Sequence, residues 1–166
     1  MINYEIYATR FGEVGIAADE QGLFALEFHS AERPMRIAPD WQRGASDLTD
    51  RAARQLGEYF AGERRVFDLP LNPRGTDFQR RVWDALLRIP YGETRSYRQQ
   101  AESLGDLKAI RAVARANGAN RIAVVIPCHR VIGADGSLTG YAGGLDMKAR
   151  LLTLEGARFV QQTELL

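Results

Sequence analysis

A short segment of turn-forming residues, 71–75 (Leu-Asn-Pro-Arg-Gly), divides the 166-residue chain into stretches with different hydrophobic periods. Before it, apolar residues alternate over short segments, which is typical of strands. After it, they recur every three or four residues, which is typical of amphipathic helices. The chain is therefore predicted to be an α+β protein with an N-terminal α/β domain at 1–71 and a mainly helical domain at 75–166.

The first stretch predicts a small antiparallel meander of strands at Asn3–Thr9, Val14–Ala18 and Leu23–His29, separated by glycine-containing turns. Residues 46–61 carry apolar side chains at helical spacing and predict one helix that packs on this sheet. Residues 66–69, before a proline, predict a further edge strand.

The second stretch opens with Thr76 and Gln79, the spacing of a capping box in which each side chain bonds a free backbone N–H group. Ser96 and Gln99 repeat the spacing. They predict a helix to about residue 104, followed by a Gly-Asp turn and a second helix at 107–117. Two short helices joined by such a turn predict a helix-turn-helix.

Charge is unevenly distributed along the chain. Residues 1–71 carry a net charge of −4 and residues 72–166 one of +5, although the whole chain carries only +1. Residues 94–130 hold two acids and seven basic residues, namely Arg95, Arg98, Lys108, Arg111, Arg115, Arg121 and Arg130. Such clustering suits a surface that faces phosphates, and an ordinary solvated face explains it equally well.

The single cysteine, Cys128, excludes an internal disulfide framework and a cysteine-rich zinc site, and it is a candidate for chemistry. A free thiol is best kept reduced inside the cell. The N-terminus lacks the pattern of a signal peptide, and no window approaches the apolar length of a membrane span. We therefore expect a cytoplasmic protein.

Residues around Cys128 favour a reactive thiol over an inert one. An apolar run at 122–126 predicts a buried strand that ends at Pro127. His129 could accept a proton from the thiol, and Glu155 could orient the imidazole. Direct contact between Cys128 and His129 would need a turn or a bridging water, since neighbouring strand side chains point to opposite faces. A buried structural thiol and a satisfied loop histidine remain open as alternatives.

Residues 126–133 (Ile-Pro-Cys-His-Arg-Val-Ile-Gly) resemble the signature of the O6-alkylguanine-DNA alkyltransferases. The resemblance covers about residues 75–156, and the first half resembles the family only in its layout. Further segments are similar in the same order, at 75–79, 82–83, 89–94, 111–113, 116–118, 139–141 and 151–156.

The resemblance implies a ribonuclease-H-like first domain and a helix-turn-helix that enters the DNA minor groove, a groove only about 6 Å wide that admits little bulk. It further implies that Arg111 replaces a base flipped out of the stack, while Tyr97 rotates the phosphate and binds the extruded guanine. The DNA-binding surface expected from the resemblance and the basic cluster comprises Tyr97, Arg95, Lys108, Arg111, Ala112, Arg115 and Ala116.

The resemblance also implies the chemistry. Cys128 would accept the alkyl group, His129 would take the thiol proton through water, and Glu155 would hold His129. Asn120 would brace the turn, and Tyr97 would stabilise the departing guanine anion. The pocket would be lined by Val131, Tyr141, Ala142 and Gly143. Because a thioether has no good leaving group, each molecule would act once.

The sequence departs from the family at Gln100, where many members have an aliphatic residue, at Ala142, where some have a hydroxyl, and at Arg115, an added charge. No cysteine cluster precedes the first domain, so the metal-dependent phosphotriester repair of larger fused relatives is not expected. Neither a metal nor a cofactor is predicted. We expect a monomer that binds double-stranded DNA containing alkylated guanine, with O4-alkylthymine as a substrate and cooperative binding left open. The alternatives are a lesion-binding protein that transfers nothing, which Cys128 argues against, and a Cys-His hydrolase.

Overall fold

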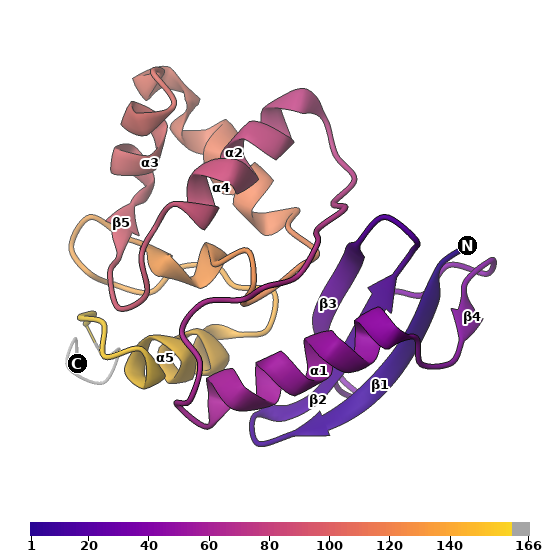
Figure 1. Cartoon of the computed structure of the whole chain (residues 1–166). Helices are drawn as coiled ribbons and strands as arrows, with labels where there is room; N and C mark the ends of the chain where they lie inside the picture. Colours follow the sequence, from indigo (N-terminus) through magenta and orange to yellow (C-terminus); the bar gives the residue numbers. More distant parts are fainter. Residues whose placement is uncertain (161–166) are drawn as a thin grey trace. The chain divides into compact units, whose positions relative to one another are not determined.

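The computed structural model of the chain describes residues 1–160 (Figure 1). The chain forms two compact units, one made of Met1–Arg74 with Arg121–Ala123, and the other of Gly75–Asn120 with the chain from Val124 onward. Within the described residues, no helix has the length and apolar character needed to cross a membrane.

The first unit is built on a sheet with the order β3-β2-β1-β4. The three predicted antiparallel strands are present as β1 (Asn3–Thr9), β2 (Gly12–Ala18) and β3 (Leu23–His29). A two-residue strand, β4 (Gln42–Arg43), pairs parallel with β1 and was not predicted. Two residues are too few to show a periodic pattern.

Both faces of this sheet are covered. The predicted helix forms as α1 (Asp47–Phe60), which lies across one face (Figure 1), and Phe60 stacks on Phe11 with ring centroids 4.3 Å apart. Met35 and Trp41 pack in an apolar cluster with Ala17 and Ala25 of β2 and β3. Every residue from Val14 to Ala18 is buried as a result, without the alternation expected of a strand with one wet face.

The predicted edge strand at residues 66–69 is wrong. The edge of β3 is instead completed by Leu71 and Ile122, which form isolated bridges with Leu23 and Leu26. Leu23 N donates to Pro70 O at 2.8 Å, and Asn72 N donates to Leu23 O at 2.8 Å. The Pro70 carbonyl therefore accepts a hydrogen bond from the edge strand β3, although proline has no N–H to donate.

The predicted strand at 122–126 is also wrong beyond Ile122. Residues 123–125 form a turn, and Val124 has the left-handed φ of 69°, which is strained for a β-branched residue. Its side chain is almost fully buried, and burial offsets the strain. A short apolar run indicates that its residues are buried but does not determine their backbone conformation. The strand prediction for residues 123–126 failed for this reason.

The second unit is mainly helical. Both predicted capping boxes form, with reciprocal hydrogen bonds between Thr76 and Gln79 and between Ser96 and Gln99. Two short strands also pair in parallel here. The elements are α2 (Asp77–Leu87), β5 (Arg95–Ser96), α3 (Tyr97–Ser103), the 3-10 turn η1 (Leu107–Ala109), α4 (Ile110–Gly118), the 3-10 turn η2 (Cys128–Arg130), β6 (Val131–Ile132) and α5 (Leu145–Leu154).

Helices α3 and α4 form the predicted helix-turn-helix, with Gly105 at φ 80° in the turn. A buried amide pair joins them, because Gln100 Nε2 donates to Asn117 Oδ1 at 2.9 Å and Asn117 Nδ2 donates to Gln100 Oε1 at 2.8 Å. The unusual Gln100 is thus explained by a partner on the next helix. Trp83 Nε1 donates to Ala116 O at 2.8 Å and ties α2 to α4.

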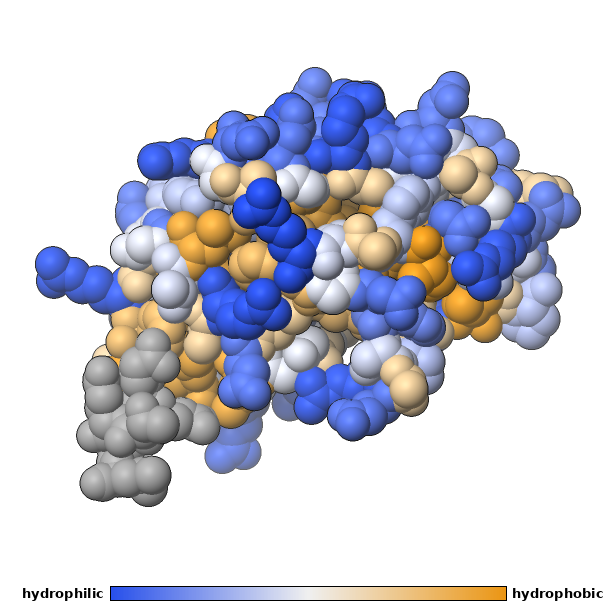
Figure 2. Space-filling model, turned by 90° about the horizontal axis from the view of Figure 1, so that it is seen from below, coloured by the Kyte–Doolittle hydropathy of each residue, from blue (hydrophilic) through white to orange (hydrophobic). Residues whose placement is uncertain are grey.

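Hydrophilic side chains cover much of the face shown in Figure 2, with apolar residues in smaller areas among them. The large apolar side chains that are most exposed come from separate parts of the described chain, namely Met1, Ile37, Val66, Leu87 and Leu107. Single exposed apolar residues are ordinary on a protein surface.

Replacing one member of the amide pair should destabilise the protein more than replacing both. We expect Gln100→Leu to lower the free energy of unfolding by about 1–3 kcal/mol, because it leaves the buried Asn117 amide unpaired. The double variant Gln100→Leu/Asn117→Leu should recover part of the loss. Urea unfolding checks both, and a Gln100→Leu variant as stable as the parent would contradict the role of the pair.

Candidate active site and nucleic-acid interface

Cys128 lies in the turn η2, directly after Pro127, and is half-buried. Its backbone N–H donates to Ile126 O at 2.8 Å, and Asn120 Nδ2 donates to the same carbonyl at 2.9 Å. The Asn120 side chain also hydrogen-bonds the sulfur. Asn120 thus braces the loop that presents the thiol. Because this segment is a turn, the side chains of Cys128 and His129 are not held on opposite faces of a strand.

A buried carboxylate lies next to that turn. Glu155, directly after α5, receives both arms of the Arg130 guanidinium, with Nε to Oε1 at 2.8 Å and Nη2 to Oε2 at 2.9 Å. His129 Nε2 lies 2.9 Å from Glu155 Oε2. Arg130 Nη1 donates to Ile89 O at 2.7 Å, which ties the site to the end of α2. This bidentate geometry is the strongest form of a charge-assisted hydrogen bond.

These contacts decide which nitrogen of His129 carries a proton. Burial acts to raise the pKa of Glu155, but the hydrogen bonds from His129 and Arg130 outweigh it and lower that pKa to about 2. The ionised carboxylate can only accept, so Nε2 must donate. Burial also lowers the pKa of His129, despite the opposing effect of Glu155. The imidazole is therefore neutral near pH 7, and its lone pair is on Nδ1.

His129 Nδ1 and the Tyr141 hydroxyl are the buried side-chain polar atoms without a hydrogen-bond partner in the described part of the chain. Such atoms are uncommon in native proteins and are found at catalytic and binding sites. Burial raises the pKa of Tyr141 well above its usual value, with the charges of Cys128 and Glu155 adding to the effect. The Tyr141 hydroxyl therefore stays protonated and can donate a hydrogen bond.

Two opposing effects act on the thiol. Burial raises the pKa of Cys128, while the hydrogen bond from Asn120 and the charge of Lys148 act to lower it, and burial prevails. At rest the sulfur therefore keeps its proton. Because the thiolate is the nucleophile, reaction requires a neighbouring base, and the free Nδ1 of His129 is chemically suited to that task.

Lys148 was not among the predicted site residues. It is fully buried on α5, with Nζ donating to Thr139 O at 2.8 Å and to Gly140 O at 3.4 Å. Burial lowers its pKa to about 8. A signal was present in the sequence, because Lys148, Leu151 and Glu155 recur at the spacing of one helix face, and a lysine on an apolar face suggests a buried role.

Tyr97 is the first residue of α3, and Lys148 reaches it through Thr139. The Tyr97 hydroxyl donates to Thr139 O at 3.3 Å, and Thr139 Oγ1 donates to the Tyr97 oxygen at 3.1 Å. Thr139 therefore connects α3 to α5. It also begins the loop of Tyr141, Ala142 and Gly143, which ends at Gly144 with φ 96°.

The remaining predicted pocket residues differ in exposure. Val131 is fully buried in β6, Ala142 is exposed, and Tyr141 and Gly143 are intermediate. Val131 could line a pocket only after a local movement, because no part of this residue is exposed.

The basic cluster separates into engaged and free residues. Arg130 binds Glu155 and Arg121 binds Glu27, so neither faces a phosphate as the clustering had suggested. Two further arginines form ion pairs near the surface. Arg95 Nη2 lies 3.2 Å from Glu93 Oε1, and Arg98 Nε lies 3.5 Å from Glu102 Oε1. Within residues 94–130, the basic groups without an ion pair are Lys108, Arg111 and Arg115, all exposed.

The small residues of α4 do not all face outward. Ala112 is half-buried, and Ala116 is only 2 % exposed and packs inside the unit, so its side chain is not on the surface expected to meet DNA. Ala114 and Gly118 are exposed instead. Helical spacing fixes which small residues share a face, but the sequence alone did not show which face is buried.

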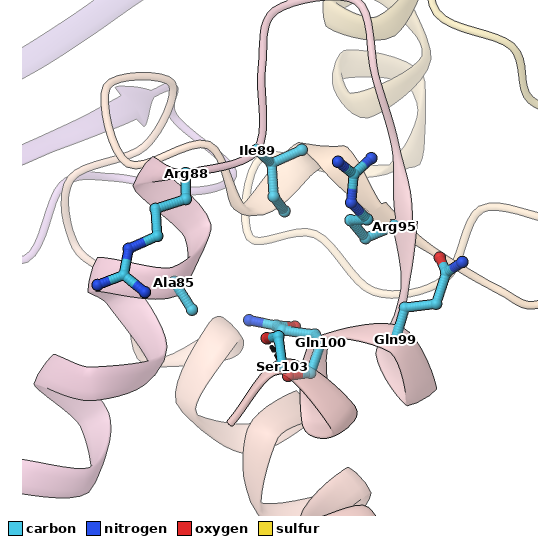
Figure 3. A pocket seen from close by; sticks show the side chains of 7 residues that line it. All are labelled: Ala85, Arg88, Ile89, Arg95, Gln99, Gln100 and Ser103. Atoms are coloured by element: carbon cyan, nitrogen blue, oxygen red, sulfur yellow. Dashed lines mark hydrogen bonds between the residues drawn. The ribbon is translucent and has the colours of Figure 1, made fainter. Parts of the chain in front are cut away.

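A cavity of about 330 Å³ lies between α2 and α3. Figure 3 shows the guanidinium groups of Arg88 and Arg95 pointing away from each other, so they do not form an anion clamp. Neither Cys128 nor Tyr97 reaches this cavity. Its lining residues are Ala85, Arg88, Ile89, Arg95, Gln99, Gln100 and Ser103.

The chain matches two family models. Residues 77–157 match "6-O-methylguanine DNA methyltransferase, DNA binding domain", and residues 2–73 match "6-O-methylguanine DNA methyltransferase, ribonuclease-like domain".

Individual relatives cover nearly the whole chain. The methylated-DNA–protein-cysteine methyltransferase of Methanosarcina acetivorans is 48% identical over 93% of this chain and 98% of its own. The constitutive enzyme of Bacillus subtilis is 45% identical over 92% and 94%. The crystal structure of Mycobacterium tuberculosis OGT in complex with DNA superimposes with a TM-score of 0.84 at 47% identity, over 93% of this chain and 92% of that one.

The Glu155 ion pair should make stability fall in acid. The pKa of Glu155 is about 2 in the folded chain against an ordinary 4.5, so its contribution is complete above about pH 4.5 and is lost as the pH falls toward 2. We expect Glu155→Gln to remove on the order of 3 kcal/mol at pH 7 and to flatten the curve between pH 4.5 and 2. Urea unfolding at a series of pH values measures this.

The matched control is Glu102→Gln, which removes an exposed carboxylate paired with Arg98 and should change stability by less than about 0.5 kcal/mol. Equal acid sensitivity in Glu155→Gln and the parent would contradict the assigned charge state.

Proposed function

The chain belongs to the 6-O-methylguanine DNA methyltransferase family, and on this premise we propose that Cys128 is the residue that receives the alkyl group. The protein is a methylated-DNA–protein-cysteine methyltransferase: it binds DNA and repairs it by direct reversal, transferring an alkyl group from the base to a cysteine. Since the chain has one cysteine, no other residue can serve as the acceptor.

The proton on the thiol has a defined route in this proposal. His129 Nδ1, which is neutral and lacks a partner among residues 1–160, accepts it by way of a water molecule. Glu155 then stabilises the imidazolium through Nε2. The observation that carries the proposal is the unpartnered Nδ1 of a neutral histidine that directly follows, along the chain, a thiol that remains protonated at rest.

The transfer itself is a displacement at carbon. The Cys128 sulfur forms a bond to the alkyl carbon as the bond from that carbon to O6 breaks, and the guanine leaves with the electron pair. Hydroxyl donors stabilise the negative charge that develops on the base, and Tyr97 and Tyr141 are the candidates. The thioether has no good leaving group, so each molecule repairs one lesion.

Access to the base requires flipping, because the alkylated atom lies within the stacked duplex. We propose that α4 enters the minor groove and that Arg111, exposed and unpaired, fills the gap left by the guanine. Tyr97 would exchange its bonds with Thr139 for bonds to the phosphate and the base. Lys108 would contact the DNA backbone, as would Arg95 after exchanging its ion pair with Glu93 for a phosphate, and Ala112 allows close approach.

We also propose that the protein acts as a monomer. O4-alkylthymine as a further substrate and cooperative binding on DNA are parts of the proposal that need their own measurements. Because the substrate is DNA, we infer that the protein works inside the cell.

Mass spectrometry tests the acceptor directly. After incubation with a duplex that contains O6-methylguanine, the peptide that contains Cys128 should gain the mass of one methyl group, and one equivalent of protein should repair one lesion. Cys128→Ser is the control and should bind the duplex without repair. An unmodified peptide despite complete binding would favour a lesion-binding protein, and turnover of an ester by catalytic amounts would favour a hydrolase.

Flipping can be separated from chemistry at Arg111. We expect Arg111→Ala to slow repair of duplex DNA by about tenfold or more, while its reaction with free O6-benzylguanine stays near the parental rate, because only the duplex needs a base to be extruded. Single-turnover rates on the two substrates measure this. Equal losses on both would refute the assigned role.

A further inference from the structure

One side of α4 is exposed along its length. Arg111, Ala114, Arg115 and Gly118 are exposed and recur at the spacing of a single helix face, and we call these four residues the α4 stripe. The stripe thus carries two long cationic side chains separated and followed by residues with little or no side chain. A surface of this form can approach a narrow groove closely while extending two guanidinium groups into it.

Contacts on the inner side of α4 fix the direction in which the α4 stripe faces. Val113 is fully buried, Asn117 is held by the amide pair with Gln100, and the Ala116 carbonyl accepts the Trp83 indole N–H. Rotation of α4 about its axis would break these contacts. Arg111 and Arg115 are therefore presented together on the outer side of a helix that is held on its inner side.

Charge pairing distinguishes the two stripe arginines from the others. Every other arginine between residues 94 and 130 has a carboxylate partner, whereas Arg111 and Arg115 have neither an ion pair nor a hydrogen bond in the described chain. Guanidinium groups without an acidic partner on the exposed side of a helix are available to an external anion. Arg111 already has a role in base flipping under the proposed function, whereas Arg115 is so far expected only to lie on the DNA-binding surface.

We propose that Arg115 is a specificity-determining residue that reads the minor groove beside the flipped nucleotide and favours lesions flanked by A·T pairs. The inference rests on the proposed function, since it requires α4 to lie in that groove. A·T-rich segments have a narrow minor groove whose negative potential attracts arginine. A flanking G·C pair instead places the exocyclic amino group of guanine on the groove floor, in the way of the guanidinium.

Helix geometry limits which base pairs Arg115 can read. It follows Arg111 by four residues, or about 6 Å along the axis at 1.5 Å per residue. Base pairs are about 3.4 Å apart, so this rise corresponds to roughly two base-pair steps. The effect should therefore be confined to the first two or three pairs beside the lesion and be absent for more distant ones.

Duplexes with one O6-methylguanine and altered neighbours provide the test. The three pairs on each side are A·T, G·C or inosine·C, and single-turnover methylation of Cys128 is followed at fixed salt. The parent should react about three- to fivefold faster with A·T than with G·C neighbours. Inosine·C should restore much of the rate, because inosine lacks the 2-amino group.

Variants separate the effect of Arg115 on the rate from the effect of how easily each duplex allows the base to flip. In Arg115→Ala the ratio of A·T to G·C rates should fall to less than half of the parental ratio, and inosine should no longer help. Arg115→Lys should retain most of the salt dependence of binding but lose much of the preference, since an ammonium group is more strongly hydrated than a guanidinium. Arg54→Ala, which removes an exposed positive charge from α1, is the matched control and should retain the parental ratio.

The measured rates distinguish a failure of the Arg115 proposal from a failure of the proposed repair function. An equal loss on all three duplexes in Arg115→Ala would mean a phosphate contact and would overturn the inference while leaving the repair function intact. Unchanged rates on every duplex would overturn it as well. Failure of the parent protein to methylate Cys128 on any duplex would instead refute the proposed function.

Discussion

The candidate active site depends on the hydrogen bonds that the buried Glu155 carboxylate accepts. This carboxylate closes a bidentate pair with Arg130 and accepts from His129, and Arg130 extends the connection to the Ile89 carbonyl. One buried charge therefore joins the end of α2, the turn that holds Cys128 and the end of α5. Removing a single partner from such a group leaves a charge without compensation, which is more costly than losing the contact alone.

The same carboxylate sets the chemistry of the thiol. Its pairing with Arg130 keeps it ionised, so His129 must direct Nε2–H toward it and leave Nδ1 free. Burial keeps Cys128 protonated until a base takes the proton. For an acceptor that reacts only once, as proposed for Cys128, this arrangement limits side reactions, because a protonated sulfur is a poor nucleophile until a base takes its proton.

The surface that we propose to face DNA includes the basic groups that have no acidic partner. Arg121 and Arg130 are used inside their own units, and Arg95 and Arg98 have acidic neighbours, which leaves the two arginines of α4 and Lys108 available. Their availability depends on the inner side of α4, where the Gln100–Asn117 pair and Trp83 hold the helix. Buried polar contacts in the core thus decide which cations are presented outside it.

The sequence by itself determined the local features: the three long strands, the helices with their capping boxes, the helix-turn-helix and the cysteine motif, because period and capping depend on residues close along the chain. Only the tertiary structure decided that residues 123–125 turn and do not extend, that β3 pairs with Leu71 and Ile122, that Ala116 faces inward, and that Lys148 and Arg130 belong to the site. These outcomes depend on partners distant in sequence. The sequence named Glu155 as the partner of His129, but the free Nδ1 depends on the Arg130 pair that keeps this carboxylate ionised, and no local pattern showed that pair.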